Sequence, residues 1–235
     1  MREFGVDEAG KGPVLGSMFA AAVVADPAEL PGDVGDSKGI APDRREELAA
    51  EIRGVAAAVG VAEIPGERID DEATDMNSLT VAAQAEALAA AAADIDSGDA
   101  DGALSGYVDA GDTNAVRFER RVAEGVADRL DGANPDVRAE HRADETYPVV
   151  GAASIVAKVE RDAHVDRLAA EHGDVGSGYP SDPATREFLE GYVAEHGSLP
   201  SCARASWKTS QDALAAATQS SLGEFEPEAT TPDDF

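Results

Sequence analysis

Two kinds of hydrophobic spacing divide the chain into predicted strands and predicted helices. Residues 3–8 and 14–25 are apolar runs on either side of the turn Gly10-Lys11-Gly12-Pro13, which predicts two strands paired as a hairpin. Residues 55–64 are mostly small or β-branched and predict a third strand. Two more strands are predicted at residues 106–110 and 136–141.

Apolar residues three or four positions apart predict helices between and after these strands. Pro42 lies near the start of one of them, a position that proline favours. The other predicted helices cover residues 78–93, 115–130, 148–169, 183–195 and 206–217. Strands come first, then alternate with helices, and helices end the chain. This order predicts an α/β fold, a sheet with helices on its faces and a helical C-terminal lobe.

We expect one domain over residues 1–217, with the helical lobe at about 170–217. From 218 to 235 Ser, Glu, Pro, Thr and Asp dominate, which predicts a disordered acidic tail. The single cysteine, Cys202, excludes an internal disulfide. The first residues form no apolar signal segment and no run approaches the length of a membrane span, so we expect a cytoplasmic protein. We also expect it to act as a monomer.

The charge of the chain is strongly negative, with 47 acidic residues against 19 lysines and arginines and a formal net charge of −28. Taken alone, this charge argues against a nucleic-acid partner, whose phosphates it would repel. The acids are spread over nearly every predicted helix and loop, which is typical of a surface adapted to high salt, where charges are screened within about 3 Å at 1 M. The four lysines are then informative, because so few remain: Lys11, Lys38, Lys158 and Lys208.

Acidic residues end three of the predicted strands, and they suggest a metal site. Asp7 and Glu8 end the first strand, Asp109 ends a later one, and Asp144 follows the last. Carboxylates that cluster in one sheet need cations to neutralise them, and oxygen ligands favour Mg²⁺ or Mn²⁺. Two such ions about 4 Å apart can activate water and stabilise the leaving oxygen of a phosphodiester.

The assignment of these acids leaves three questions open. Neighbouring residues of a regular strand point to opposite faces, so Asp7 and Glu8 reach one site only if the strand bends or if one acts through its carbonyl or a water. Glu145 competes with Asp144 as a ligand. Asp112 fits a turn or helix cap better than a metal site.

A nucleotide-binding loop is one alternative interpretation of the opening turn. The spacing from Gly5 to Lys11 fits G-x-x-x-x-G-K, but Gly12 stands where a P-loop has Ser or Thr, and a strand follows instead of a helix. The acids inside the loop would also repel phosphates. A second alternative is a non-catalytic protein that binds RNA–DNA hybrids.

Six blocks of the sequence, in order, resemble ribonuclease HII in its archaeal form. They begin with Asp7-Glu8-Ala9-Gly10-Lys11-Gly12-Pro13 and end with Trp207-Lys208-Thr209; between them lie Asp36-Ser37-Lys38, Tyr107-Val108-Asp109-Ala110, residues 143–162 and residues 176–183. The resemblance implies an RNase H-like mixed sheet with a helical C-terminal part. It also implies cleavage of RNA in RNA–DNA hybrids and of DNA at the 5′ side of embedded ribonucleotides, leaving a 3′-hydroxyl and a 5′-phosphate.

The resemblance also implies roles for individual residues. Asp7, Glu8, Asp109 and Asp144 match the catalytic acids that bind two divalent ions, Mg²⁺ or Mn²⁺. The turn that inspects the 2′-hydroxyl, which separates RNA from DNA, is matched by Gly10, Lys11 and Gly12. The family usually has arginine in place of Lys11, which keeps the charge but changes its geometry. The remaining substrate-binding candidates are Tyr179, against the neighbouring sugar, Lys158, near the scissile phosphate, and Lys38 and Lys208, on the backbone.

The end of the chain resembles a second kind of motif. Gln219-Ser220-Ser221-Leu222-Gly223-Glu224-Phe225 is similar to the peptide by which replication enzymes bind the sliding clamp. Such peptides usually end in two aromatic residues, and here Glu226 follows Phe225. The alternative is an ordinary disordered tail.

Overall fold

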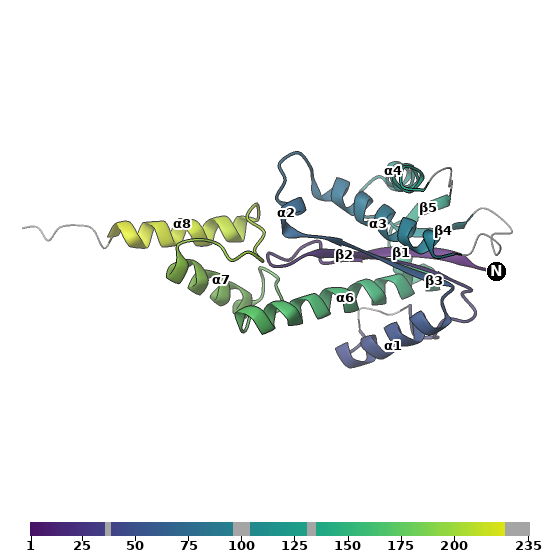
Figure 1. Cartoon of the computed structure of the whole chain (residues 1–235), viewed down its shortest axis with the longest axis horizontal. Coiled ribbons are helices and arrows are strands. Elements are labelled where there is room, and N and C mark those ends of the chain that lie inside the picture. The colour runs from purple at the N-terminus through teal and green to yellow at the C-terminus, as the bar shows by residue number, and fades with distance from the viewer. Residues whose placement is uncertain (36–38, 96–103, 131–134, 224–235) are drawn as a thin grey trace, which may run out of the picture.

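A five-stranded mixed sheet forms the centre of the computed structural model, which describes residues 1–35, 39–95, 104–130 and 135–223, with side chains up to 219 (Figure 1). The strand order is β3-β2-β1-β4-β5. Strands β1 and β2 pair antiparallel, as do β2 and β3, whereas β4 runs parallel to both β1 and β5. The strands are β1 (Glu3–Ala9), β2 (Met18–Ala25), β3 (Ala58–Ile64), β4 (Ser105–Asp109) and β5 (Asp136–Glu140). The predicted α/β class is confirmed.

The predicted hairpin of β1 and β2 is present, but β2 begins four residues later than expected. Residues 14–17 are buried, yet they lie outside the sheet, and Val14 and Leu15 pack in the core of the C-terminal lobe. The amides of Val14 and Leu15 donate to the Gly178 carbonyl at 2.8 and 3.2 Å, and Leu15 forms an isolated bridge with Ala203. Tertiary contacts of this segment therefore replace the strand pairing that its hydrophobicity predicted.

Helices cover both faces of the sheet. Helices α3 (Met76–Ala93) and α4 (Ala115–Ala127) lie on one face, and α1 (Pro42–Val55) and α6 (Pro148–His172) on the other (Figure 1). Small residues let these helices come close. A Cβ atom on Gly5 would lie 2.1 Å from the Val149 carbonyl carbon of α6, and one on Gly60 would lie 2.1 Å from the Ala87 carbonyl oxygen of α3. The alanine-rich sequence thus builds tight layers rather than bulky ones.

The C-terminal lobe projects from one end of the sheet and contains α7 (Pro183–His196) and α8 (Lys208–Gly223) (Figure 1). Its core joins Leu189 and Val193 of α7 to Val14, Leu15 and the end of α6. Helix α8 continues to Gly223, so the predicted end of this helix at residue 217 is six residues short. Residues 224–235, the rest of the predicted tail, lie outside the described part of the chain.

Two short helices were absent from the sequence prediction: α2 (Gly66–Ile69) and α5 (Ala143–Thr146). Each is a single turn beside a proline, which hydrophobic periodicity cannot detect. Helix α5 matters for the site, because it carries Asp144. Among the described residues, no helix combines the length and the apolar character needed to cross a bilayer.

Candidate active site

The predicted acids lie at the carboxyl ends of the parallel strands. Asp7 and Glu8 are near the end of β1, and Asp109 ends the neighbouring strand β4, whose Val108 pairs with Val6. Asp144 is in α5, just after β5. Because β1, β4 and β5 run in the same direction, their carboxyl ends meet at one edge of the sheet. This edge brings acids from three distant parts of the sequence together.

Strand β1 stays regular through both acids, so Asp7 and Glu8 point to opposite faces. Pairing with β2 continues without interruption from Glu3 to Ala9. Asp7 faces α6, where the Ser154 hydroxyl bonds its carboxylate. Glu8 faces α3, where the Gln84 amide donates to Glu8 Oε2 at 2.6 Å. The strand does not bend, and the two carboxylates flank the edge of the sheet from its two sides.

Burial and mutual repulsion make the charged forms of these acids costly. Burial raises the pKa of Asp7 well above its usual range, and repulsion from Glu8 and Asp109 adds to this. Burial also raises the pKa of Glu8 to about 7, although Gln84 and Lys11 act in the opposite direction. The pKa of Asp109 is raised by burial and by repulsion from Asp144. The four acids therefore form one interacting set, as strongly perturbed groups at active sites often do.

A strained backbone position holds the third and fourth acids. Arg142 has φ of 61°, the only positive φ of a non-glycine residue among those described. The chain turns there, and the Ala143 amide donates to Asp109 Oδ1 at 2.8 Å. Asp144 follows at once and is 8% exposed, whereas the Glu145 side chain is 39% exposed and pairs with Arg142 at 3.3 Å. The structure thus favours Asp144 over Glu145 as the member of the acidic set.

The chemistry of this set fits divalent cations. All four side chains offer oxygen ligands. Burial and mutual repulsion raise the pKa values of Asp7, Glu8 and Asp109, so neighbouring positive charge would stabilise their charged forms. Within the described residues, however, no three acidic, histidine or cysteine side chains already converge as ligands would. Gln84 holds Glu8 towards α3, and Ala143 holds Asp109 towards α5, so the two side chains are bonded to different elements.

The Gly10-Lys11-Gly12 turn borders these acids. Gly10 has φ of +86°, and an added Cβ would lie 3.0 Å from the Ser17 carbonyl, so the position requires glycine. Lys11 reaches across to the end of β4, where its Nζ donates to the Gly111 carbonyl at 2.7 Å. Its positive charge also partly offsets the rise that burial causes in the pKa of Glu8. Lys11 therefore belongs to the acidic site as well as to the turn.

A groove of about 480 Å³ lies between this turn and α6. Two of the predicted lysines, Lys11 and Lys158, line it together with the turn and Tyr179. Lys158 donates to the Ser154 hydroxyl at 3.0 Å, and Ser154 in turn bonds Asp7. The groove thus runs directly into the acidic site.

Sequence reasoning missed two further cations of the groove, Arg45 and Arg161. Asp162 holds both: Arg45 Nη2 lies 3.0 Å and Arg161 Nη1 lies 3.3 Å from its carboxylate oxygens. The Arg161 guanidinium also lies 5.1 Å from the centre of the Tyr179 ring. The prediction followed the rare lysines and treated arginines as ordinary. Arg45 of α1 and Arg161 of α6 share Asp162 as a partner only in the folded protein, so no local sequence pattern identified them.

Gln84 was missed as well. It is fully buried in α3, and its amide bonds both Glu8 and the Asp109 carbonyl. A lone amide among alanines and valines is the sequence signal that could have found it.

The other predicted substrate contacts lie outside this cluster. Lys208 is 84% exposed and pairs with Asp212 at 2.7 Å, and it does not line the groove. Lys38 lies outside the described residues. Asp112 precedes α4 and pairs with Arg117 of that helix, consistent with a structural role.

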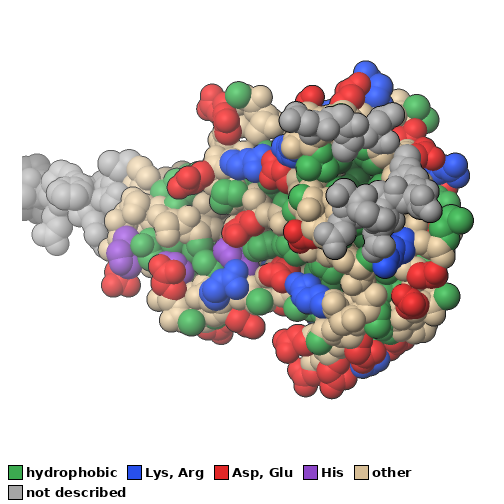
Figure 2. All heavy atoms as spheres, turned by 45° about the vertical axis from the view of Figure 1, so that its right-hand side comes forward, with side chains coloured by type: hydrophobic (Ala, Val, Ile, Leu, Met, Phe, Trp, Pro, Cys, Tyr) green, Lys and Arg blue, Asp and Glu red, His purple; other side chains and the backbone are tan. Residues whose placement is uncertain are grey.

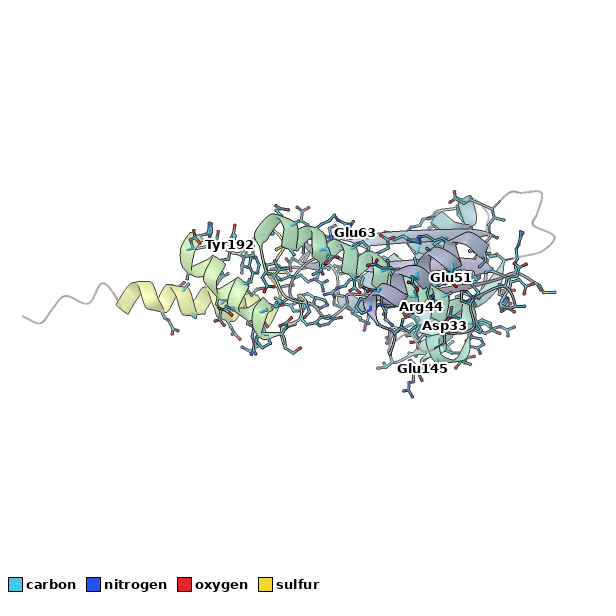
Figure 3. The ribbon with its side chains drawn as sticks, turned by 90° about the horizontal axis from the view of Figure 1, so that it is seen from below. Asp33, Arg44, Glu51, Glu63, Glu145 and Tyr192 are labelled. Atoms are coloured by element: carbon cyan, nitrogen blue, oxygen red, sulfur yellow. The ribbon has the colours of Figure 1, made fainter. Side chains whose placement is uncertain are left out.

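On the face shown in Figure 2, red acidic side chains form scattered patches among hydrophobic and other atoms, with fewer blue lysines and arginines. Arg44 of α1 forms ion pairs with exposed acids. It lies 3.1 Å from Asp33 and 2.9 Å from Glu51 (Figure 3). Arg44 thus serves the exposed side of α1, while its neighbour Arg45 lines the groove. The groove gathers four cations, Lys11, Arg45, Lys158 and Arg161, in a chain of net charge −28.

The structure defines an RNase H-like sheet with acids at the carboxyl ends of its parallel strands. The family model "Ribonuclease HII" matches residues 4–210, and the chain belongs to this family. Ribonuclease HII from Haloarcula marismortui is 66% identical over 94% of this chain and 99% of its own length.

Two solved structures extend the similarity. The ribonuclease H2 from Pyrococcus horikoshii has a TM-score of 0.81 at 33% identity, covering 93% of this chain and all of its own. The ribonuclease HII of a PCNA:RNase HII complex from Archaeoglobus fulgidus has a TM-score of 0.75 at 39% identity, covering 88% of this chain and 96% of its own. The family identifies the protein as a ribonuclease, a hydrolase that acts on RNA–DNA hybrids.

Proposed function

We propose that this ribonuclease cuts the RNA strand of RNA–DNA hybrids and also cuts DNA on the 5′ side of embedded ribonucleotides, leaving a 3′-hydroxyl and a 5′-phosphate. The observation that carries the proposal is the continuity of the basic groove with the acidic site. A backbone lying in the groove passes the Gly10-Lys11-Gly12 turn and reaches Glu8, next to Asp7 in the same strand. Duplexes with embedded ribonucleotides are then the substrates that such a turn can select.

Asp7, Glu8, Asp109 and Asp144 are the residues that would hold two Mg²⁺ or Mn²⁺ ions. Bound there, such ions would activate water and stabilise the leaving oxygen. The raised pKa values support this, because divalent cations would relieve the repulsion among the four acids. Gln84 and Ser154 orient Glu8 and Asp7 from the two faces of the sheet.

The chain's other residues bind and orient the substrate. Lys158, Arg45 and Arg161 supply positive charge for phosphates along the groove. Tyr179 is 38% exposed and offers its ring to a sugar beside Gly12. Lys38 and Lys208 stay predicted backbone contacts. Because high salt weakens phosphate contacts steeply, recognition should depend more on the turn and Tyr179 than on charge.

Cleavage of a hybrid with Mn²⁺ or Mg²⁺ in molar KCl tests the assignment of the acids. Asp7→Asn, Asp109→Asn and Asp144→Asn should each lower kcat by roughly 100-fold or more, as expected for groups that stabilise transition-state charge. Glu145→Gln is the matched control, because it removes the neighbouring charge and should keep near-normal activity. Near-normal cleavage by Asp7→Asn or Asp109→Asn would show that the assignment is wrong.

Two competing functions give different results in the same assay. A P-loop protein would bind ATP and would not depend on a ribose in the DNA. A non-catalytic binding protein would retain the hybrid and release no product when Mn²⁺ is added. The P-loop alternative is disfavoured by the regular strand β1, which carries the acids where a phosphate loop would begin.

We further propose that the end of the chain binds a sliding clamp. The Archaeoglobus fulgidus relative was solved in a complex with PCNA, which supports this role for the similar peptide here. Residues 219–223 continue helix α8, while Glu224 and Phe225 lie outside the described residues. Deleting residues 219–235 should abolish clamp binding in a pull-down assay and leave hybrid cleavage unchanged.

The cellular setting is also a proposal: a monomer working in the salt-rich cytoplasm of its host. The acidic surface and the similarity to a Haloarcula protein support the adaptation to salt. Activity should fall strongly when salt is removed, and full stability without salt would count against the adaptation.

A further inference from the structure

The C-terminal lobe touches the Gly10-Lys11-Gly12 turn through a completely buried cation, Arg204. Its Nε donates to the Gly16 carbonyl at 2.8 Å, its Nη2 to the Gly10 carbonyl at 2.7 Å and its Nη1 to the Lys11 carbonyl at 3.1 Å. The side chain is 0% exposed. Each of these acceptors is a backbone carbonyl rather than a carboxylate, so the guanidinium stabilises the conformation of the loop between β1 and β2.

A second side chain of the same segment completes the contact. The Trp207 indole lies 5.0 Å from the Arg204 guanidinium, and its Nε1 donates to the Gly12 carbonyl at 3.3 Å. The carbonyls of Gly10, Lys11 and Gly12 are therefore all bonded to the lobe. Burying a cation away from a carboxylate is costly, and burial lowers the pKa of Arg204 to about 10. The group still carries its proton at neutral pH.

The geometry of the peptide bond decides where the other side of the turn points. In a planar trans peptide the N–H is directed opposite to the carbonyl. Because the Gly10 and Lys11 carbonyls face Arg204, the amide N–H groups of Lys11 and Gly12 are directed away from it. Among the described residues neither amide donates a hydrogen bond to a protein acceptor, and both residues line the groove.

We propose that Arg204 is a positioning residue for ribose recognition. It fixes the carbonyl side of the turn and so presents the Lys11 and Gly12 amides to the sugar of the bound strand. This inference rests on the proposed role of the turn. Arg204 bonds the three carbonyls through three separate nitrogens of a planar group, whereas a lysine has all its donors on one nitrogen, and therefore lysine is an incomplete substitute.

Substitution of Arg204 by methionine removes the fork and keeps an unbranched side chain of similar length. We expect Arg204→Met to lower kcat/KM for a duplex with one embedded ribonucleotide by roughly 10- to 100-fold, as expected when a binding group is misplaced. The dissociation constant for an all-DNA duplex of the same sequence should stay within twofold, because the groove cations remain. Arg204→Lys should recover part of the loss.

Leu189→Ala is the control for general damage to the lobe. Leu189 is fully buried in the lobe core and belongs to α7, away from the carbonyls of the turn. Compared at equal fractions folded, this variant should keep the wild-type kcat/KM. Amide hydrogen exchange of Lys11 and Gly12 gives a direct readout, and it should become faster in Arg204→Met and not in Leu189→Ala.

The proposal is overturned if folded Arg204→Met keeps kcat/KM within twofold of wild type, or if the exchange of the two amides is unchanged. Where Arg204→Met does not fold, Trp207→Phe decides, because it keeps the ring and removes the donor to Gly12. A loss of about fivefold supports the proposal, in line with one hydrogen bond, and an unchanged kcat/KM overturns it. If cleavage by the wild-type protein does not depend on the ribonucleotide, the proposed function is refuted. Hydrogen exchange of the Lys11 and Gly12 amides would still test the positioning role of Arg204.

Discussion

Replacing Glu8 by glutamine should make the folded protein more stable above pH 7 when divalent cations are absent. Burial, with a contribution from the charge of Asp109, raises the pKa of Glu8 from its ordinary value of 4.5 to about 7. An ionised Glu8 therefore disfavours folding. Glutamine keeps the size of the side chain and an oxygen that can accept from Gln84, but it carries no charge to bury.

The size and the pH range of the effect follow from this pKa. A carboxyl group whose pKa rises by this amount on folding costs at most about 3 kcal/mol when it is ionised. Glu8 keeps partial contact with solvent, so we expect about 1–2 kcal/mol. The folded state holds the proton more tightly than the unfolded state. The cost is therefore complete above pH 7, shrinks as the pH falls and disappears below about 4.5.

Denaturant unfolding of both proteins with EDTA in molar KCl measures the difference. High salt screens charge repulsion but does not remove the cost of burial, which is the larger cause, so the effect should persist. Glu145→Gln changes the net charge equally at a more exposed position and is the control. The reasoning fails if Glu8→Gln is no more stable than Glu145→Gln at pH 8, or if the gain does not change between pH 8 and pH 5.

Two further predictions test how the backbone places the acids. Gly5→Ala would drive a methyl group into the Val149 backbone of α6, and should lower the free energy of unfolding in urea by on the order of 2 kcal/mol. Arg142→Gly should unfold at the same denaturant concentration as wild type or a higher one, because glycine accepts a positive φ, whereas Arg142→Val should lose about 1–2 kcal/mol and most cleavage activity. Equal activity of the glycine and valine variants would contradict the role given to this position.

Local patterns were sufficient for most of the elements and for the acids. Apolar runs and turn chemistry predicted the hairpin of β1 and β2, and acids at strand ends predicted the edge of the sheet where Asp7, Glu8 and Asp109 lie. Residues 14–17 show the limit of such patterns. Val14 and Leu15 are as apolar as strand residues, but their partners are Gly178 and Ala203, more than 150 positions away, so their path is decided by the lobe.

The groove and the support of the turn could not be predicted, because they depend on contacts between distant segments. Arg45 and Arg161 become neighbours only when α1 packs beside α6, with Asp162 between them. Arg204 lies almost 200 residues from the turn that it bonds. The expectation that β1 must bend, or that one acid must act indirectly, treated the site as lying on one face. The structure instead has Asp7 and Glu8 on the two sides of a sheet edge.

The central claim is that acids at this edge cut the backbone beside a ribose selected by the turn. The most direct test is incubation of a 5′-labelled duplex that carries one ribonucleotide with wild-type protein and Mn²⁺ in molar KCl, beside an all-DNA duplex. We predict a single cut on the 5′ side of the ribonucleotide, a product with a 3′-hydroxyl, and an intact all-DNA duplex. Cleavage of both duplexes, or a cut that does not follow the ribonucleotide when it is moved, would contradict the account.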